Sequence, residues 1–380
     1  MNVVPINYVF DRDLTDPEAL LARYTTLTGW SDALTAAGAC VTVVQRFRSR
    51  ATISRAGVTY VFTPSPTSDI ARMPASIDVV HVNGLIFPAR TWALRQMLPS
   101  SAPIVVQDHG SQPFSTRRRF ALGRRWVRRW MLGAADAFLF AATEQSDAWK
   151  AAGLIAPQQR VYDVMPASTS FAPVHRDQAR ASSGISGSPA MLWVGRLNAN
   201  KDPLTVLSGF ERCVSRTLPN ATLTMVYSER DLLAAVRARI ETSSLLRDRV
   251  RLVGATAHDD LPAFYSAADL FVVGSHHEGS GYSLIEACAC GATPVVTDIP
   301  SFRAITGHGT IGALWQPGDA ASFAHALAAA GAKNLEAARA AALRHFDRTL
   351  SWPVIGRRAM DVYREIASAR SAVHGLAAER

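Results

Sequence analysis

Residues 272–300 read VVGSHHEGSGYSLIEACACGATPVVTDIP, and the fold class can be predicted from them. An apolar run, Leu270–Val273, leads into a small polar loop with glycines, and the pattern predicts a helix from Tyr282 onward. A second apolar run, Thr293–Thr297, then returns the chain to the sheet. Strand, turn, helix and strand make a βαβ unit, which predicts a parallel α/β sheet with its ligand side at the turn.

Two carboxylates frame this turn, with seven residues between them. Glu278 lies in the loop and Glu286 in the first turns of the expected helix, while Gly279 and Gly281 leave backbone N–H groups unshielded where the helix begins. A helix start presents unsatisfied donors and partial positive charge, which suit a phosphate. A carboxylate about one turn further along can accept hydrogen bonds from a diol such as a ribose. The stretch therefore predicts a site for a nucleotide.

A second set of polar residues lies in GRLNANKDP, residues 195–203. A short apolar run delivers Arg196 and Lys201 into one loop, and Pro203 is expected to open the next helix. Two cations on one loop suit a diphosphate without a metal, since they neutralise the charge that builds on a leaving diphosphate. The alternative is an exposed Arg and Lys without a role, but their occurrence upstream of the acid pair favours function.

Together these residues resemble the E-x7-E signature of retaining glycosyltransferases, in the family-4-like, sucrose-synthase-like group of bacterial enzymes. Glu278, Gly279, Gly281, Glu286 and Gly291 carry the resemblance, with Pro294-Val295-Val296 after them. The resemblance covers nearly the whole chain, most strongly from Leu192 to Asp319. It implies an α/β protein with the GT-B fold, in which two Rossmann-like, doubly wound domains face each other across a cleft.

The same resemblance implies where the domains lie. We expect an N-terminal acceptor-side domain over residues 1–172, with an amphipathic C-terminal helix (from Trp352, within about 352–380) packing back on it. The Ser- and Gly-rich stretch 173–189 is expected to be the linker. The nucleotide-sugar-binding domain should span 190–351, with one helix over 230–247 and a turn at 312–319. No glycine follows the first strand until Gly29, which excludes a dinucleotide-dehydrogenase motif there.

The resemblance also implies roles for individual residues. His109, in Gln107-Asp108-His109-Gly110 after an expected strand, should face the donor sugar, and His81 is the alternative histidine. The catalytic residues implied are His109, Arg196, Lys201 and Glu278. The nucleotide-sugar-binding residues implied are Gly195, Arg196, Lys201, Gly254, Glu278, Gly279, Gly281, Tyr282, Ser283, Leu284 and Glu286. The resemblance implies that no metal and no cofactor is required, and no Asp-x-Asp occurs near the site.

The function implied is transfer of a sugar from a nucleoside-diphosphate sugar, with retention, to a glycan, lipid-linked or small-molecule acceptor. The setting expected is bacterial polysaccharide, glycolipid or other glycoconjugate synthesis at the cell envelope. One alternative is a GT-B nucleotide-sugar epimerase or phosphorylase. Another, from a different class, is a catalytically silent nucleotide-binding scaffold. The sequence leaves the sugar, the base and the acceptor open.

The net charge of +9, from 40 Lys and Arg against 31 Asp and Glu, is concentrated in one segment. Between Asp108 and Asp136 there are seven arginines and no acid. Because the positive charge is confined to this segment, the charge distribution argues against a protein that coats nucleic acid along its whole surface. On a helical wheel, six of these arginines fill one half and apolar residues, among them Trp126 and Trp130, fill the other. Two interpretations stay open: a core-facing helix with a solvated basic side, or a helix over Arg117–Arg129 that docks on an anionic membrane.

The remaining composition indicates a cytoplasmic protein, peripheral on the inner face of the cell membrane if the arginine helix docks there. The four cysteines show no metal-ligand spacing, which favours core thiols in a reducing compartment. The N-terminal residues MNVVPINYVF read as a first strand rather than a signal peptide. No apolar run approaches the ~20 residues of a membrane span.

Overall fold

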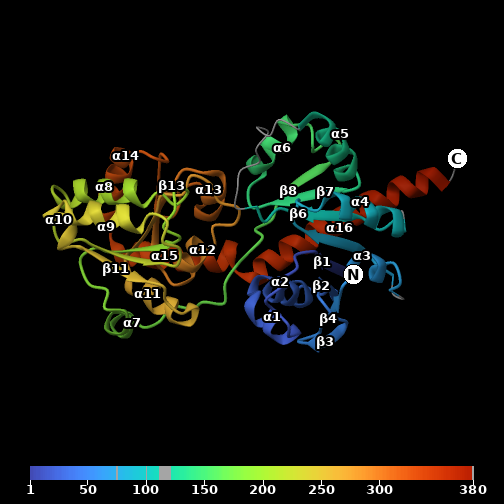
Figure 1. Cartoon of the computed structure of the whole chain (residues 1–380), viewed down its shortest axis with the longest axis horizontal. Helices are drawn as coiled ribbons and strands as arrows, with labels where there is room; N and C mark the ends of the chain where they lie inside the picture. Colours follow the sequence, from blue (N-terminus) through green and yellow to red (C-terminus); the bar gives the residue numbers. More distant parts are fainter. Residues whose placement is uncertain (74–75, 100, 111–120, 379–380) are drawn as a thin grey trace. The chain divides into compact units, whose positions relative to one another are not determined.

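The computed structural model describes residues 1–73, 76–99, 101–110 and 121–378, and the chain divides into two compact units (Figure 1). Unit 1 comprises Met1–Ser168 and Trp352–Arg380, and unit 2 comprises Thr169–Ser351. Each unit is built around a largely parallel sheet with helices on its faces. The α/β class with two Rossmann-like units is thereby confirmed.

Unit 1 contains an eight-stranded sheet with the order β3-β4-β2-β1-β5-β6-β7-β8. All neighbouring strands are parallel except β3, which pairs antiparallel with β4 at the edge. The chain proceeds from β1 to one side and later returns to the other side at β5, which makes the sheet doubly wound. The strands are β1 (Asn2–Asn7), β2 (Cys40–Arg46), β3 (Ala51–Arg55), β4 (Val58–Thr63), β5 (Val79–Asn83), β6 (Ile104–Gln107), β7 (Ala137–Phe140) and β8 (Arg160–Asp163).

Successive residues of the central strands alternate between two hydrophobic cores, one on each face of this sheet. In β1, Val3 belongs to one core and Val4 and Ile6 to the other. Burial on both faces is what a parallel sheet covered by helices requires. The helices of unit 1 are α1 (Pro17–Arg23), α2 (Thr25–Ala36), α3 (Pro66–Ile70), α4 (Pro88–Met97), α5 (Ala121–Leu132), η1 (Thr143–Ser146), α6 (Asp147–Ala151) and α16 (Trp352–Ala378).

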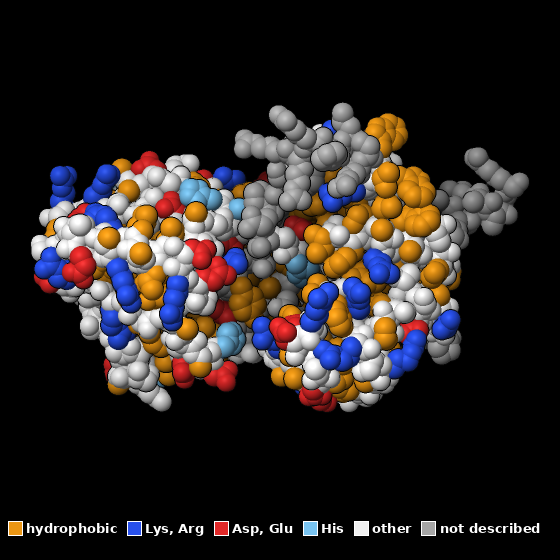
Figure 2. Space-filling view, in the orientation of Figure 1, with side chains coloured by type: hydrophobic (Ala, Val, Ile, Leu, Met, Phe, Trp, Pro, Cys, Tyr) orange, Lys and Arg blue, Asp and Glu red, His pale blue; other side chains and the backbone are white. Residues whose placement is uncertain are grey.

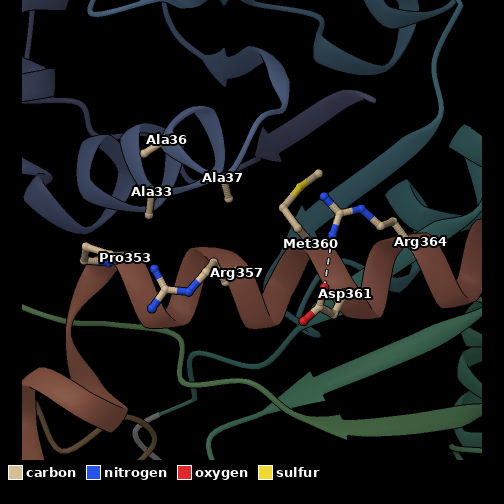
Figure 3. Close-up of a pocket in the computed structure, with 8 residues that line it drawn as sticks. All are labelled: Ala33, Ala36, Ala37, Pro353, Arg357, Met360, Asp361 and Arg364. Carbon is tan, nitrogen blue, oxygen red and sulfur yellow. Dashed lines mark hydrogen bonds and ion pairs between the residues drawn. The ribbon is translucent and has the colours of Figure 1, made fainter.

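The C-terminal helix α16 completes one of these cores by packing against α2. Small residues allow the close approach: a Cβ on Gly29 would lie 2.5 Å from the Trp352 ring, and one on Gly356 would lie 2.3 Å from the Ala33 carbonyl oxygen. Gly29 therefore serves helix packing. Figure 3 shows the shallow groove that remains between the two helices. The helix continues to Ala378, within the range of about 352–380 predicted for it.

Unit 2 contains a six-stranded, fully parallel sheet with the order β11-β10-β9-β12-β13-β14. Strands β12 and β13 have the bounds that the sequence predicts, and the helix between them begins at Tyr282, as predicted. The strands are β9 (Ala190–Gly195), β10 (Thr222–Tyr227), β11 (Val250–Gly254), β12 (Leu270–Val273), β13 (Thr293–Thr297) and β14 (Ala313–Trp315). The turn predicted at 312–319 thus begins with an edge strand, β14, which the sequence analysis missed.

The helices of unit 2 differ from expectation in one place. The single helix expected over 230–247 is two helices, because Ser243 ends one segment and caps the next by accepting a hydrogen bond from the Leu246 amide at 3.4 Å. The helices are α7 (Arg176–Ser183), α8 (Pro203–Val214), α9 (Leu233–Glu241), α10 (Ser244–Arg247), η2 (His258–Asp260), α11 (Leu261–Ala267), α12 (Tyr282–Ala289), α13 (Pro300–Thr306), α14 (Ala320–Gly331), α15 (Leu335–His345) and η3 (Phe346–Leu350).

The stretch 173–189, expected to be a linker, is instead part of unit 2 and carries helix α7. The physical reason is a set of ion pairs that its composition does not reveal. Arg176 pairs with Asp269, and Arg180 lies 3.4 Å from the same carboxylate. Asp269 also accepts a hydrogen bond from the Ala190 amide at 2.7 Å, so one buried carboxylate joins α7 to the start of β9.

Candidate functional site

The two predicted groups of polar residues lie at the same edge of the unit 2 sheet. Strand β9 runs parallel to its neighbours β10 and β12 and ends at Gly195, so residues 196–202 leave the sheet at its carboxyl edge. Strand β12 ends beside it at Val273, and residues 274–281 lead from there to α12. The carboxyl edge of a parallel sheet is where such folds bind ligands. The arrangement on which the nucleotide interpretation depends is therefore present.

Lys201 and Glu278 form an ion pair at this edge. The Lys201 Nζ lies 2.6 Å from the Glu278 Oε1, and the two side chains are only 11% and 12% exposed. One residue comes from the loop after β9 and the other from the loop after β12. A cation and an acid predicted from separate motifs are thus in direct contact in a partly desolvated position, where their interaction is stronger than at the surface.

Asn200 fastens the same two loops together through its side-chain amide. Its Nδ2 donates to the His277 carbonyl oxygen at 2.9 Å, and its Oδ1 accepts from the His277 amide at 3.1 Å. The Asn200 carbonyl oxygen accepts from the His276 amide at 2.8 Å. His276 and His277 are therefore parts of this loop junction, which fixes the position of the Lys201–Glu278 pair.

The start of α12 requires a glycine. Gly281 precedes the helix with φ of 60°, in the left-handed region, and a Cβ there would lie 2.7 Å from Ile305. The Leu284 amide donates to the Gly281 carbonyl oxygen at 2.9 Å. Of the three amides predicted to hold a diphosphate, those of Tyr282, Ser283 and Leu284, that of Leu284 is therefore engaged in the first turn.

Glu286 is buried, with 3% exposure, and its carboxylate is held from two sides. The Tyr265 hydroxyl donates to Oε2 at 2.8 Å, and the His258 Nε2 lies 3.1 Å from Oε1. Burial raises the pKa of Glu286, and these two partners offset part of the rise. The ring of Phe171 packs at a tilt against that of His258, with 4.7 Å between centroids. The predicted ribose ligand is thus pre-oriented beside an aromatic and an imidazole ring.

Arg196 occupies a more open position at the same edge. Its side chain is 43% exposed, and its Nη1 lies 3.5 Å from the Oε1 of Glu229, which follows β10. The Asn198 Nδ2 donates to the other Glu229 oxygen at 3.3 Å. Among the residues that the structure describes, Arg196 is therefore held by a long, solvated ion pair, which is worth about 1 kcal/mol or less.

Gly254 also reaches this edge, at the end of β11 next to β10. It has φ of 91°, and a Cβ built on it would meet no atom within 4 Å. The backbone beside it is open. This geometry allows a flat group such as a base to approach the main chain, in keeping with the nucleotide-sugar-binding role that the resemblance implies for Gly254.

The two candidate histidines of unit 1 have different surroundings. His81 is fully buried, and its Nδ1 is hydrogen-bonded to the hydroxyl of Tyr363 on α16. Burial lowers the pKa of His81 to about 3, so the ring is neutral and structural. His109 lies two residues past the end of β6, is exposed, and has its Nε2 3.2 Å from the Asn83 Oδ1. The contact of His109 with a donor sugar stays a prediction.

Two observations concern metals and membranes. Within the described ranges, no three His, Cys, Asp or Glu side chains lie close enough together to hold a metal ion. Across the same ranges, no helix is both long and apolar enough to traverse a bilayer.

The sequence analysis missed several residues at this edge, namely His258, Tyr265, Phe171, Glu229 and Asn200. His258 and Glu229 lie within four residues of a strand's carboxyl end, which is the same signal that selected His109. Applied to every strand, that rule finds both. Tyr265 and Phe171 carry no such signal, because they reach the site from a helix and from the first residues of unit 2.

Comparison with known proteins agrees with this geometry. Residues 175–342 match the profile of the family described as Glycosyl transferases group 1. The chain is 28% identical over 358 residues to the GDP-mannose:cellobiosyl-diphosphopolyprenol alpha-mannosyltransferase of Xanthomonas campestris, which covers 93% of this chain and 86% of that protein. It is 26% identical over 322 residues to the D-inositol 3-phosphate glycosyltransferase 1 of Catenulispora acidiphila, covering 78% and 74%.

Solved structures agree on the fold. The sucrose-phosphate synthase of Thermosynechococcus elongatus superposes with a TM-score of 0.69 at 19% identity, over 97% of this chain and 99% of that one. The likeness identifies the architecture as the GT-B fold and, at this identity, speaks for the fold alone.

Proposed function

Since residues 175–342 belong to the glycosyl transferases group 1 family, within a chain of GT-B fold, we propose that this protein moves a glycosyl group from a nucleoside-diphosphate sugar to an acceptor hydroxyl, with retention at the anomeric carbon. The observation that carries the proposal is the meeting of Arg196, the Lys201–Glu278 pair and the buried Glu286 at one sheet edge. These groups match the charge and hydroxyl pattern of such a donor.

In this proposal each group at the edge binds one part of the donor. Glu286, held by Tyr265 and His258, accepts hydrogen bonds from the hydroxyls of the ribose. Arg196 and Lys201 bind the diphosphate, together with backbone amides at the start of α12. Glu278, already adjacent to Lys201, orients the sugar hydroxyls nearest the diphosphate. A preorganised set of charges of this kind stabilises a transition state more than it stabilises the free donor.

The chemical step that we propose balances without an enzyme nucleophile. The bond between the anomeric carbon and the diphosphate oxygen breaks, and the acceptor oxygen bonds to that carbon on the same face. The departing diphosphate takes the proton of the acceptor hydroxyl. The protein contributes orientation and positive charge. We expect no metal in this step, because Arg196 and Lys201 supply the charge, and a chelator should leave the rate unchanged.

For the acceptor we propose a lipid-linked glycan of a bacterial cell envelope, handled by a cytoplasmic enzyme at the inner face of the membrane. The support is the Xanthomonas campestris relative, whose name gives a diphosphopolyprenol-linked acceptor. A free glycan or a small alcohol is the competing acceptor class, in keeping with the inositol phosphate in the name of the second relative.

A donor screen tests the proposal. The full chain is incubated with UDP-, GDP- and ADP-sugars, and release of nucleoside diphosphate is followed with and without acceptor extracts. A transferase releases nucleotide faster when acceptor is present, and proton NMR of the product reads its anomeric configuration. Inversion would rule out the retaining mechanism.

The same screen separates the alternatives. A new sugar isomer from donor alone would indicate an epimerase, and a phosphate-dependent release would indicate a phosphorylase. Binding of a nucleotide without any release, from any donor, would indicate a silent scaffold and would remove the transferase proposal.

A further inference from the structure

Helix α5 of unit 1 has an exposed apolar side. All eight tryptophans of the chain lie among the described residues, and two of them are more than half exposed: Trp126 at 74% and Trp130 at 59%. Both lie on α5, one turn apart, and Val127 beside them is 50% exposed. Large apolar side chains gathered on the surface mark an interaction site rather than ordinary surface composition.

This exposure decides between the two interpretations of the arginine helix. A core-facing helix would bury Trp126, Val127 and Trp130, but residues 125–130 are exposed throughout. The helix is anchored at its end, where Leu132 is buried, and at Trp130, whose ring stacks on Trp92 of α4 at 4.9 Å. Figure 2 shows hydrophobic side chains gathering over α4 and α5 on the face in view. The apolar side thus faces solvent.

A basic side completes the helix. Arg125, Arg128 and Arg129 are exposed, and none of them forms an ion pair with any other described residue. At ~100° per residue they occupy the arc opposite Trp126, Val127 and Trp130. A helix with an apolar arc bearing tryptophan and a basic arc has the form of one that lies in a membrane interface.

The basic side also borders a groove. Arg129 and Lys150 line a hollow of about 450 Å³ together with Gly153, Ile155 and Pro157. The guanidinium groups of Arg125 and Arg129 lie 3.5 and 3.9 Å from where a Gly153 Cβ would be. Lys150 forms an exposed ion pair with Asp147, whose carboxylate lies 3.9 Å from the Lys150 Nζ. The groove therefore presents cations beside apolar walls, which complements a phosphate carried on acyl chains.

We infer that helix α5 docks unit 1 on an anionic phospholipid bilayer, through Trp126, Val127 and Trp130 on its apolar arc and Arg125, Arg128 and Arg129 on its basic arc, with Lys150 beside the basic arc. The tryptophan rings enter the headgroup layer, and the cations bind lipid phosphates. This inference deepens the proposed location at the membrane, on which it rests, and it does not depend on glycosyl transfer. The occupant is a bilayer rather than a protein because apolar and unpaired basic residues alternate along one helix.

The test is flotation of the full chain with phosphatidylcholine vesicles that contain or lack phosphatidylglycerol. We expect at least about tenfold stronger binding to the anionic vesicles, weakening with added salt. Arg125→Gln with Arg129→Gln should reduce that binding about twentyfold, since each basic residue near an anionic surface contributes about fivefold. Trp126→Ser should reduce it about tenfold through lost apolar burial.

A matched control separates this face from general attraction of a basic protein. Arg216 and Arg237 of unit 2 are exposed arginines away from α5, and their double change to Gln removes the same charge. The inference is overturned if wild type binds both vesicle types equally, if the α5 variants bind like wild type, or if the control loses as much binding. Melting temperatures check that each variant is folded, and Trp126→Ser alone avoids the Trp130–Trp92 contact.

A second readout keeps this inference apart from the proposed function. Release of nucleotide from the donor in vesicle-free buffer should be the same for the α5 variants and wild type. A chain that floats with anionic vesicles but never releases nucleotide would contradict the transferase proposal and leave the docking face standing. Release of nucleotide without flotation on anionic vesicles would support the transferase proposal and contradict the docking face.

Discussion

Arg196 and Lys201 carry the same charge but have different environments, so we expect them to bind the diphosphate in different ways. The Lys201–Glu278 pair is close and mostly buried, and breaking such a pair by removing one partner costs about 3–5 kcal/mol. The Arg196–Glu229 pair is long and exposed and contributes about 1 kcal/mol or less. We therefore expect Arg196 to leave Glu229 for a diphosphate at little cost, and Lys201 to bind that diphosphate without leaving Glu278.

We predict that Arg196→Ala lowers kcat by about 100-fold or more, with a smaller change in KM. The physical reason is that its charge is needed most when the diphosphate departs. The melting temperature should stay the same, because the side chain is exposed and weakly paired. Steady-state kinetics with the donor found in the screen measures this. Arg230→Ala, an exposed arginine nearby in the chain, is the control, and unchanged turnover in the Arg196 variant would contradict the assignment.

Glu286 gives a prediction about pH. Burial raises its pKa above the ordinary 4.5, so the folded protein holds this proton more tightly than the unfolded chain does. The stability that the group contributes is complete below pH 4.5 and is lost as the pH rises through the higher folded value. Glu286→Gln cannot ionise, so its free energy of unfolding should rise relative to wild type across this window. Urea unfolding at a series of pH values measures the difference.

The same substitution should weaken the donor site. Loss of the charged ribose ligand is expected to raise the donor KM about tenfold or more, since hydrogen bonds to charged groups contribute about 1.5–3 kcal/mol. Glu144→Gln, at an exposed position in unit 1, controls for the loss of one negative charge.

In the urea series, a difference in the free energy of unfolding between Glu286→Gln and wild type that stays constant with pH would contradict a raised pKa for Glu286.

At the scale of elements, the turn before α12 depends on Gly281. We predict that Gly281→Ala lowers the free energy of unfolding by about 2–4 kcal/mol, because strain at a left-handed φ adds to overpacking against Ile305. Gly254→Ala is the matched control: its φ is also left-handed, but its Cβ would meet nothing within 4 Å, so about 1–2 kcal/mol is expected. Urea midpoints measure both. Equal losses would show that the crowding at Gly281 has no effect.

Local signals predicted the elements that they encode, and long-range contacts produced the rest. The helix predicted from Tyr282 begins there, because Gly281 and the flanking apolar strands are adjacent in the sequence. Helix α7 was missed, since it depends on Arg176 and Arg180 meeting Asp269 about 90 residues away. Strand β3 was missed too: three of its five residues are exposed or polar, and only pairing with β4 reveals it.

The candidate site shows the same division at the scale of the whole molecule. The motif spacing predicted Arg196, Lys201, Glu278 and Glu286, and the parallel sheet brings their loops to one edge. It did not predict His258 and Tyr265, which contact Glu286 from two other segments of unit 2, or Phe171, whose ring packs against both of them. The helical wheel of α5 predicted two faces, but the burial of either face depends on its neighbours in the fold. The sequence pattern shows the periodicity of each helix or strand, but it does not show which distant segments contact one another.

The two units give the last prediction, because each has its own sheet and core. If the nucleotide binds at the carboxyl edge of the unit 2 sheet, it stabilises the elements there by mass action, by about 2.7 kcal/mol at 100 times its Kd. Hydrogen exchange should therefore slow in residues 196–202, in η2 and in α12 when the preferred nucleoside diphosphate is added. Exchange in β1 and α16 of unit 1 should change little, since local opening there is governed by a separate core. Glu286→Gln at the same nucleotide concentration should lose most of the protection in unit 2. Protection confined to unit 1 would contradict a nucleotide site on the unit 2 sheet. Protection in unit 2 that persists in the Glu286 variant would support binding at this sheet edge but contradict the assignment of the ribose to Glu286.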